Sequence, residues 1–328
     1  MINLFNINEY DISTSSFDNW LNGSIVAEFE ETIASYVGAK YACSFNSASS
    51  AIFLSLLNKN ITANIPSLSA AMDENTTVNI PSMLPPVVAN MILNSGNSIE
   101  FRDDVDWVGG SYVLHDFGNY KIIDSAQRLI KNQFRQEANA EDLMLFSFYP
   151  TKPIGSCDGG MIVSDDYEKI AWFKMATQNG SIYSKNSWDR RIAFPGWKMY
   201  MNSMQAYIAM ENFKRYEDKL AKISKVRELY NAEFGYSNTS DHLYRINVAD
   251  RESVIDIFNR EQIGYGIHYE PLHLNSVYSD CIGFNIMPPK LERTESLKDS
   301  TLSIPLHENL STQDIDCILG LVSGSLYG

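Results

Sequence analysis

The sequence has few cysteines, a deficit of basic side chains and no long hydrophobic run. Its four cysteines, Cys43, Cys157, Cys281 and Cys317, show no CxxC spacing, which in a chain of this size favours free thiols over a disulfide framework. The 26 basic side chains against 40 acidic ones give a net charge of −14, so no nucleic-acid-binding surface is expected. No segment approaches the roughly 20 apolar residues of a membrane span and the N-terminus resembles no signal peptide, so we expect a cytoplasmic protein.

Glycine-rich phosphate loops are also absent. Residues 46–50 contain no glycine and match neither a Walker loop nor a GxGxxG turn, which gives ATP or NAD binding little support. His268 and His273 lie five residues apart around a proline, a spacing that does not place two imidazoles on one helical face as a zinc site of that type requires. We therefore predict no metal site.

Short apolar runs and helical stripes dominate what is present. The runs recur through residues 98–163, at a density typical of buried strands in a mainly parallel sheet. An apolar stripe over residues 26–37 predicts a helix that Gly38 ends. Residues 202–234 predict one long helix.

The pattern changes in the C-terminal third of the chain. An alternating strand, an amphipathic helix, a second strand and a closing helix follow one another there, as in a small α+β unit. We predict an α/β protein with a mainly parallel central sheet flanked by helices over residues 1–215, and a small C-terminal α+β domain over residues 216–328.

Two polar side chains stand at the ends of predicted strands. Lys152 follows an apolar strand and precedes a Gly-Gly pair that opens another, and Asp124 ends a strand just before Gln127. A lysine amine and a buried carboxylate are the pair that pyridoxal phosphate chemistry needs. The strand-to-helix turn at residues 46–50 would expose helical N–H groups, which can hold a phosphate.

These segments, in this order, resemble the DegT/StrS type of pyridoxal-phosphate sugar aminotransferases, which are fold-type I (aspartate-aminotransferase-like) enzymes. The segments that carry the resemblance are residues 29–42, 46–52, 123–127, 146–152, 195–206 and 268–273. Together they extend over most of the chain, so the resemblance implies the fold-type I architecture with pyridoxal 5'-phosphate as the cofactor.

The resemblance also implies roles for individual residues. Lys152 would bind the cofactor aldehyde covalently and carry protons, and Asp124 would pair with the ring nitrogen. The other implied cofactor-binding residues are Gln127 near the ring oxygen, Ala48, Ser49 and Ser147 at the phosphate, and Lys198 at the phosphate of the neighbouring subunit. The last role implies a homodimer with shared active sites. His268 and His273 would lie on the substrate side.

The function that the resemblance implies is transfer of an amino group, from glutamate, to a nucleotide-linked keto-deoxysugar for surface-polysaccharide or antibiotic-sugar synthesis. One alternative is a sugar dehydratase of the same family, but such enzymes carry histidine at the position of Lys152. Another is a non-catalytic protein of the same fold with a binding or regulatory role.

Two departures from the family pattern bear on the non-catalytic alternative. Only 23 steps separate Phe101 from Asp124, where the family has a longer strand-helix-strand passage, and residues 81–86 offer no aromatic side chain to stack on the cofactor ring. Two others bear on the substrate: Tyr200 stands where many members carry arginine or asparagine, and Asp158 where glutamate is usual.

Overall fold

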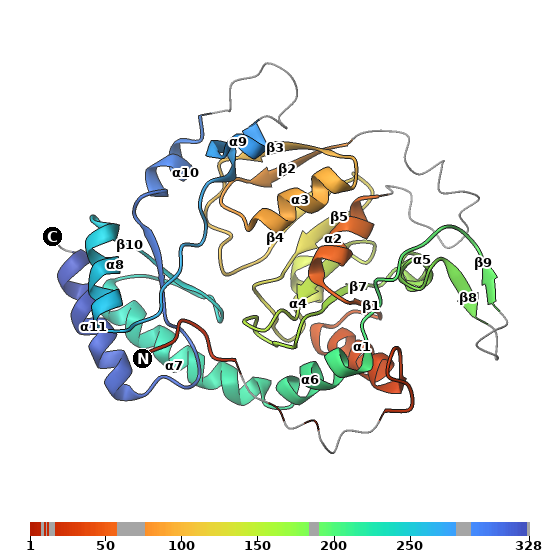
Figure 1. Cartoon of the computed structure of the whole chain (residues 1–328), viewed down its shortest axis with the longest axis horizontal. Coiled ribbons are helices and arrows are strands. Elements are labelled where there is room, and N and C mark those ends of the chain that lie inside the picture. The colour runs from red at the N-terminus through yellow and green to blue at the C-terminus, as the bar shows by residue number, and fades with distance from the viewer. Residues whose placement is uncertain are drawn as a thin grey trace.

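The computed structural model describes residues 1–7, 10, 12, 17–57, 76–183, 190–279 and 290–326. A central sheet lies between helices, and a second group of helices and strands lies beside it, next to both chain ends (Figure 1). Cys43, Cys157 and Cys317 are free thiols, and Cys281 lies outside the described residues. Within the described ranges, no helix is long and apolar enough to cross a membrane.

The central sheet has five strands in the order β1-β7-β6-β5-β4. These strands are β1 (Tyr41–Phe45), β4 (Tyr112–Asp116), β5 (Lys121–Asp124), β6 (Leu143–Ser147) and β7 (Gly160–Ser164). Only the β5–β6 pair is parallel, whereas β1–β7, β6–β7 and β4–β5 are antiparallel. The α/β architecture is as predicted, but this sheet is mixed rather than mainly parallel.

The antiparallel direction of β4 and β5 follows from their short connection. Phe117 N–H donates to the Tyr120 carbonyl across 3.0 Å in the turn that joins β4 to β5. A parallel pair needs a crossover of a dozen or more residues, usually a helix, whereas a tight turn joins antiparallel neighbours. The few residues available between Phe101 and Asp124 therefore make β4 and β5 a hairpin.

Both faces of the sheet are buried. In β6, Leu145 packs into one hydrophobic cluster, whereas Met144 and Phe146 pack into a second cluster on the other face. This alternation is the consequence of side chains pointing to opposite faces along a strand. The flanking helices are α1 (Ser24–Val37), α2 (Ala48–Leu56), α3 (Pro86–Asn94), α4 (Gln133–Glu137), α5 (Tyr167–Thr177) and α6 (Ser203–Phe213).

Several local predictions are confirmed and others are not. Helix α1 ends at Val37 and Gly38 caps it with φ 85°, a left-handed conformation that glycine takes without steric cost. The single helix predicted over 202–234 is two helices, α6 and α7 (Tyr216–Phe234). Three strands were not predicted: β2 (Thr77–Pro81), which pairs with the partly predicted β3 (Ser98–Arg102), and β8 (Ser181–Tyr183) and β9 (Arg190–Ile192), which pair with each other.

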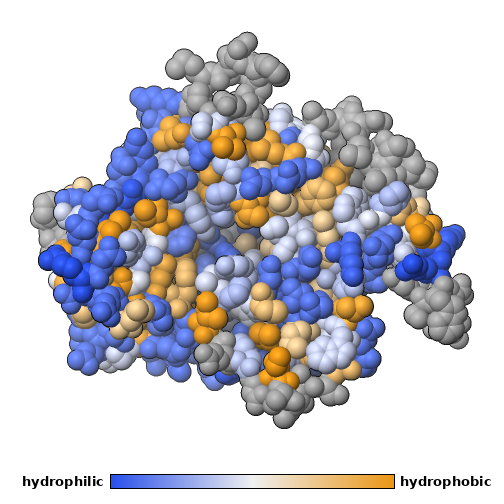
Figure 2. All heavy atoms as spheres, viewed as in Figure 1, coloured by the Kyte–Doolittle hydropathy of each residue, from blue (hydrophilic) through white to orange (hydrophobic). Residues whose placement is uncertain are grey.

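A third hydrophobic cluster gathers residues of α7, β10 (Tyr244–Asn247), α8 (Arg251–Arg260), β11 (Thr301–Ile304) and α11 (Thr312–Leu326). The 3-10 turn η2 (Leu272–Leu274) and α9 (Ser276–Ser279) instead contribute Leu272 and Tyr278 to the cluster that contains Leu145, and α10 (Glu292–Leu297) follows them in the chain. β10 and β11 form an antiparallel pair. The domain division at residues 215 and 216 stays a prediction. Hydrophilic and hydrophobic side chains are interspersed over the face shown in Figure 2.

Candidate active site

Three strands of the central sheet end at the same edge. β1 and β6 both run antiparallel to β7, and their last residues, Phe45 and Ser147, both pair with Gly160. β5 is parallel to β6 and ends at Asp124. Loops after such strand ends are where open α/β sheets bind their ligands.

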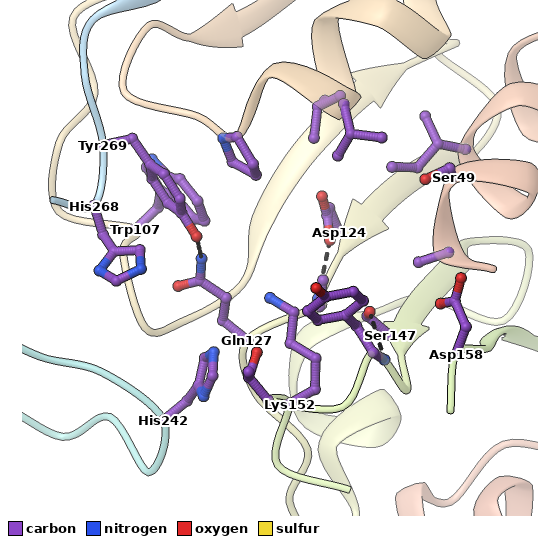
Figure 3. A pocket seen from close by; sticks show the side chains of 18 of the residues that line it. Ser49, Trp107, Asp124, Gln127, Ser147, Lys152, Asp158, His242, His268 and Tyr269 are labelled. Carbon is purple, nitrogen blue, oxygen red and sulfur yellow. Dashed lines mark hydrogen bonds between the residues drawn. The ribbon is translucent and has the colours of Figure 1, made fainter. Parts of the chain in front are cut away.

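A cavity of about 450 Å³ opens at this edge. Its lining residues come from the N-terminal segment, the strand ends and the turns after them, the starts of α2 and α3, the segment before β4 and the C-terminal part of the chain: Phe5, Ala48, Ser49, Ile52, Pro85, Val87, Val88, Trp107, Asp124, Ala126, Gln127, Ser147, Tyr149, Thr151, Lys152, Asp158, His242, His268 and Tyr269. Figure 3 shows the Lys152 amine between two groups, with His242, His268, Trp107 and Tyr269 on one side and Ser49, Ser147 and Asp158 on the other.

Lys152 lies in the turn that follows β6, where its backbone N–H donates to the Tyr149 carbonyl across 2.9 Å. Burial lowers the pKa of its amine to about 8, although the Asp124 carboxylate opposes this shift. Burial acts in this direction because it disfavours the charged ammonium. The amine is therefore far closer to its nucleophilic, neutral form at physiological pH than an exposed lysine is.

Asp124 is a buried carboxylate whose two oxygens are both hydrogen-bonded. Tyr112 Oη donates to Oδ2 across 2.7 Å, and the Ala126 backbone N–H donates to Oδ1 across 2.9 Å. Burial raises the pKa of Asp124, and these two hydrogen bonds and the Lys152 charge oppose the rise. A carboxylate held in this way has lone pairs left for one more cationic donor.

Gln127 is buried on the wall of the cavity beside Asp124. The Gly109 backbone N–H donates to Gln127 Oε1 across 2.6 Å, and Gln127 Nε2 donates to Tyr269 Oη across 2.6 Å. Because the Gly109 N–H is a donor, the end of the Gln127 side-chain amide that it faces must be the oxygen. The second N–H of Nε2 is available to a ligand.

The opposite end of the cavity is suited to an anion. Ala48 and Ser49 begin α2, and Ser47 caps the helix by accepting from the Ser50 backbone N–H across 3.2 Å. A Cβ added at Gly160 would lie 2.6 Å from the Ala48 nitrogen, so glycine at this position lets α2 begin close against β7. Uncapped N–H groups and the helix dipole favour a phosphate here.

Two histidines enter the cavity from the C-terminal part of the chain. His268 Nδ1 lies 2.8 Å from Ser303 Oγ, and burial with the positive charges of Lys152 and Arg245 lowers the pKa of His268 to about 4. The ring of His242 stacks on Phe5 with centroids 5.2 Å apart, and burial lowers its pKa well below the usual value. Both imidazoles are neutral at physiological pH.

The structure brings most of the residues singled out from the sequence into this cavity: Ala48, Ser49, Asp124, Gln127, Ser147, Lys152 and His268. His273 does not line it. That residue is buried behind β2, where Nδ1 lies 2.6 Å from Ser82 Oγ and Nε2 lies 3.6 Å from a Glu295 oxygen. Lys198 is exposed, outside the cavity of its own chain, in an isolated bridge with Gln178.

Sequence reasoning missed several lining residues. Trp107 stacks parallel to Tyr269 with ring centroids 6.1 Å apart and an interplanar angle of 2°. Its only signal in the sequence was its position in the shortened passage before Asp124. Phe5 and His242 gave no signal, because their proximity to Lys152 depends on how distant segments pack.

This donor set fits an aromatic aldehyde that carries a phosphate and a basic ring nitrogen. The Lys152 amine, the Asp124 carboxylate and the N-terminus of α2 are separate features of one cavity, and Gln127 keeps an unused N–H donor there. Pyridoxal 5'-phosphate has a chemical complement for each of them.

Comparison with known proteins identifies one family of aminotransferases. The model of the DegT/DnrJ/EryC1/StrS aminotransferase family matches residues 7–103 and 120–323. The UDP-4-amino-4,6-dideoxy-N-acetyl-beta-L-altrosamine transaminase of Campylobacter jejuni is 28% identical, covering 94% of this chain and 93% of its own length. The spore coat polysaccharide biosynthesis protein SpsC of Bacillus subtilis is 24% identical, covering 97% and 94%.

Solved structures share the fold. PseC of Helicobacter pylori, an aminotransferase involved in the biosynthesis of pseudoaminic acid, has a TM-score of 0.75 at 18% identity and covers 96% of this chain and 94% of its own. AtS13 of Actinomadura melliaura has a TM-score of 0.78 at 18% identity, covering 99% of each chain. The predicted fold class, that of the sugar aminotransferases, is confirmed.

Proposed function

The chain belongs to the DegT/DnrJ/EryC1/StrS aminotransferase family, and from this premise we propose that it moves an amino group from glutamate to the keto carbon of a nucleotide-linked deoxysugar. The names of the relatives support a nucleotide-linked sugar, and one names polysaccharide synthesis. The product would accordingly serve surface-polysaccharide or antibiotic-sugar synthesis.

One observation carries the proposal: the Lys152 amine and the buried Asp124 carboxylate lie in the same cavity as the N-terminus of α2. When bound, pyridoxal phosphate supplies an aldehyde and an electron-accepting ring. Lys152 would hold the aldehyde carbon, Asp124 the protonated ring nitrogen, and Gln127 Nε2 the ring oxygen. Ala48, Ser49 and Ser147 would bind the phosphate.

Lys152 would also serve as the acid and base of the reaction. A lowered pKa lets the same amine accept a proton from one carbon and return it to another at physiological pH. The presence of lysine at this position also argues against the sugar dehydratase, for which the resemblance implies histidine.

We further propose a homodimer with shared sites. Lys198 is exposed and does not line the cavity of its own chain. This position suits a residue that reaches the phosphate held by the partner subunit. A flexible ammonium binds a phosphate as a point charge. His268 would contact the sugar, whereas the position of His273 supports a packing role.

The test is the reverse half-reaction. Protein loaded with pyridoxal phosphate is mixed with nucleotide-linked 4-aminosugars, beginning with a UDP-linked 4-amino-4,6-dideoxy sugar, and loss of the absorbance of the lysine-bound cofactor is followed. We expect rapid loss with at least one nucleotide-linked aminosugar, and recovery when 2-oxoglutarate is added.

The control is the Lys152→Ala variant, which should show no such cycle. If uridine-, thymidine-, guanosine- and cytidine-linked 3- and 4-aminosugars all fail while ordinary amino acids cycle the cofactor in both directions, the protein is an amino-acid aminotransferase. If no cofactor absorbance forms at all, a non-catalytic role replaces the proposal.

A further inference from the structure

Residues 104–119 lie outside the two stretches that the family model matches. This segment contains Trp107, Gly109 and the strand β4, and it runs beside the cavity rather than away from it. The hairpin turn that follows β4 brings Tyr112 opposite Asp124 in the β4–β5 register. A part of the chain that departs from the family pattern therefore touches the residues assigned to the cofactor ring.

The first contact is between two buried side chains. Tyr112 is 6% exposed and Asp124 is 5% exposed, and Tyr112 Oη lies 2.7 Å from Asp124 Oδ2. Burial and the Asp124 charge raise the pKa of Tyr112, so the phenol keeps its proton and donates it. The Trp107 ring, 4.7 Å from that of Tyr112 between centroids, holds the phenol in place.

The second contact is between Gly109 and Gln127. The Gly109 N–H donates a hydrogen bond to Gln127 Oε1. This orients the Gln127 side-chain amide with its Nε2 toward Tyr269 and the cavity. Gly109 has φ 86°, and an added Cβ there would lie 2.5 Å from Ser240 Cβ. The hydrogen bond to Gln127 and the close packing against Ser240 therefore fix the Gly109 backbone at the cavity wall.

We propose that the segment 104–119 is the support of the cofactor ring in this protein, with Tyr112 as the positioning residue for Asp124 and Gly109 as the positioning residue for Gln127. The inference rests on the proposed function only through the cofactor, and not through the sugar. Tyr112 donates to the carboxylate that would pair with the ring nitrogen, so its hydroxyl lowers the affinity of that carboxylate for a proton. With the cofactor bound, the proton would therefore stay on the ring nitrogen, where it would make the ring an electron sink.

The experiment uses the full chain loaded with pyridoxal phosphate labelled with ¹⁵N at the ring nitrogen. Tyr112→Phe removes the hydroxyl and keeps the ring. We expect the ¹⁵N signal to move toward the position of an unprotonated ring. The first half-reaction with glutamate should slow about tenfold to a hundredfold, the size of one hydrogen bond to a charged group, with the KM for glutamate changed less than about twofold.

The matched control is Tyr230→Phe, which removes the hydroxyl of another buried tyrosine in the third cluster. That hydroxyl has no hydrogen-bond partner among the described residues, so the ¹⁵N signal and the rate should stay at the wild-type values. If Tyr112→Phe does not fold, 3-fluorotyrosine at position 112 replaces it. This more acidic phenol is a stronger donor and should move the ¹⁵N signal in the opposite direction.

An unchanged ¹⁵N signal in both position-112 proteins would overturn the inference, and so would an equal change in the Tyr230→Phe control. Failure of every sugar substrate would instead count against the proposed function. The ring nitrogen can be observed without any sugar, so the two failures remain distinguishable.

Discussion

At Lys152 two environmental effects act on one amine in opposite directions. Burial lowers its pKa to about 8, and the negative Asp124 raises it. Only the neutral amine attacks an aldehyde. The rate at which cofactor-free protein captures pyridoxal phosphate should therefore rise with pH to a half-maximum at about pH 8 and level off above it. Stopped-flow absorbance over pH 6 to 10 measures this.

Asp124→Asn supplies the control for that profile. Removing the negative charge removes the interaction that favours the ammonium, so the half-maximum should move to lower pH. A wild-type half-maximum near the pKa of an exposed lysine, or a shift to higher pH in Asp124→Asn, would contradict the environment assigned to Lys152.

The same Asp124→Asn substitution bears on chemistry after the cofactor has bound. An amide cannot hold the ring nitrogen in its protonated form, so the carbanion loses its electron sink. Cofactor binding should persist in part, because Ala48, Ser49 and Ser147 still face the phosphate end. The proton-transfer step should slow by about two orders of magnitude or more. Single-turnover kinetics with glutamate test this, and a nearly normal rate would refute the role.

Sequence alone could single out residues whose positions follow from local pattern. Asp124 and Ser147 end strands and Lys152 lies in the turn that follows Ser147, and strand ends that share a direction meet at one edge of a sheet. Trp107 and His242 could not be found in this way, because they reach the cavity only through the packing of distant segments. The resemblance of residues 268–273 implied a substrate-side position for His273, whereas a turn at Leu272–Leu274 buries it against Ser82.

At the scale of elements, the β4–β5 hairpin includes residues that the family model leaves unmatched. Gly118 sits in its turn with φ 86°, and an added Cβ would meet no atom within 4 Å. The cost of a side chain there is therefore conformational rather than steric. Gly118→Ala should lower the free energy of unfolding by about 1 kcal/mol, measured by urea denaturation.

Gly118→Asn is the matched variant, because asparagine adopts a left-handed backbone more readily than alanine does. It should be the more stable of the two. If both variants matched the wild type, the turn would not need a positive φ at this position, and the account of the hairpin would be wrong.

The strands themselves were predictable, but their directions were not. Apolar runs predicted the segments that form β4, β5, β6 and β7. They did not predict strand direction, because a buried strand has the same apolar composition whichever way it runs. Direction depends on the connections. The passage between Phe101 and Asp124 was recognised as short, yet only the structure shows that the missing crossover reverses β4 relative to β5.

At the scale of the whole molecule, the proposed dimer makes a prediction about mixtures. If each site combines Lys152 of one subunit with Lys198 of the other, a hybrid of Lys152→Ala and Lys198→Ala chains has one intact site and one doubly damaged site. Random pairing in a two-fold dimer gives hybrids in half of the molecules, so co-expressed chains should recover about a quarter of wild-type activity. Each variant alone should be nearly inactive.

The control combines two substitutions of groups that the same subunit supplies to a site. Lys152→Ala and Asp124→Asn both remove groups that one chain supplies to its own cavity, so their hybrid has no intact site and should recover nothing. Recovery in the first mixture but not in the second would show that Lys198 acts across the subunit boundary. Equal activity in both mixtures, or full activity in a monomer by sedimentation, would leave Lys198 without that role. Its exposure outside the cavity of its own chain would then be that of an ordinary surface lysine.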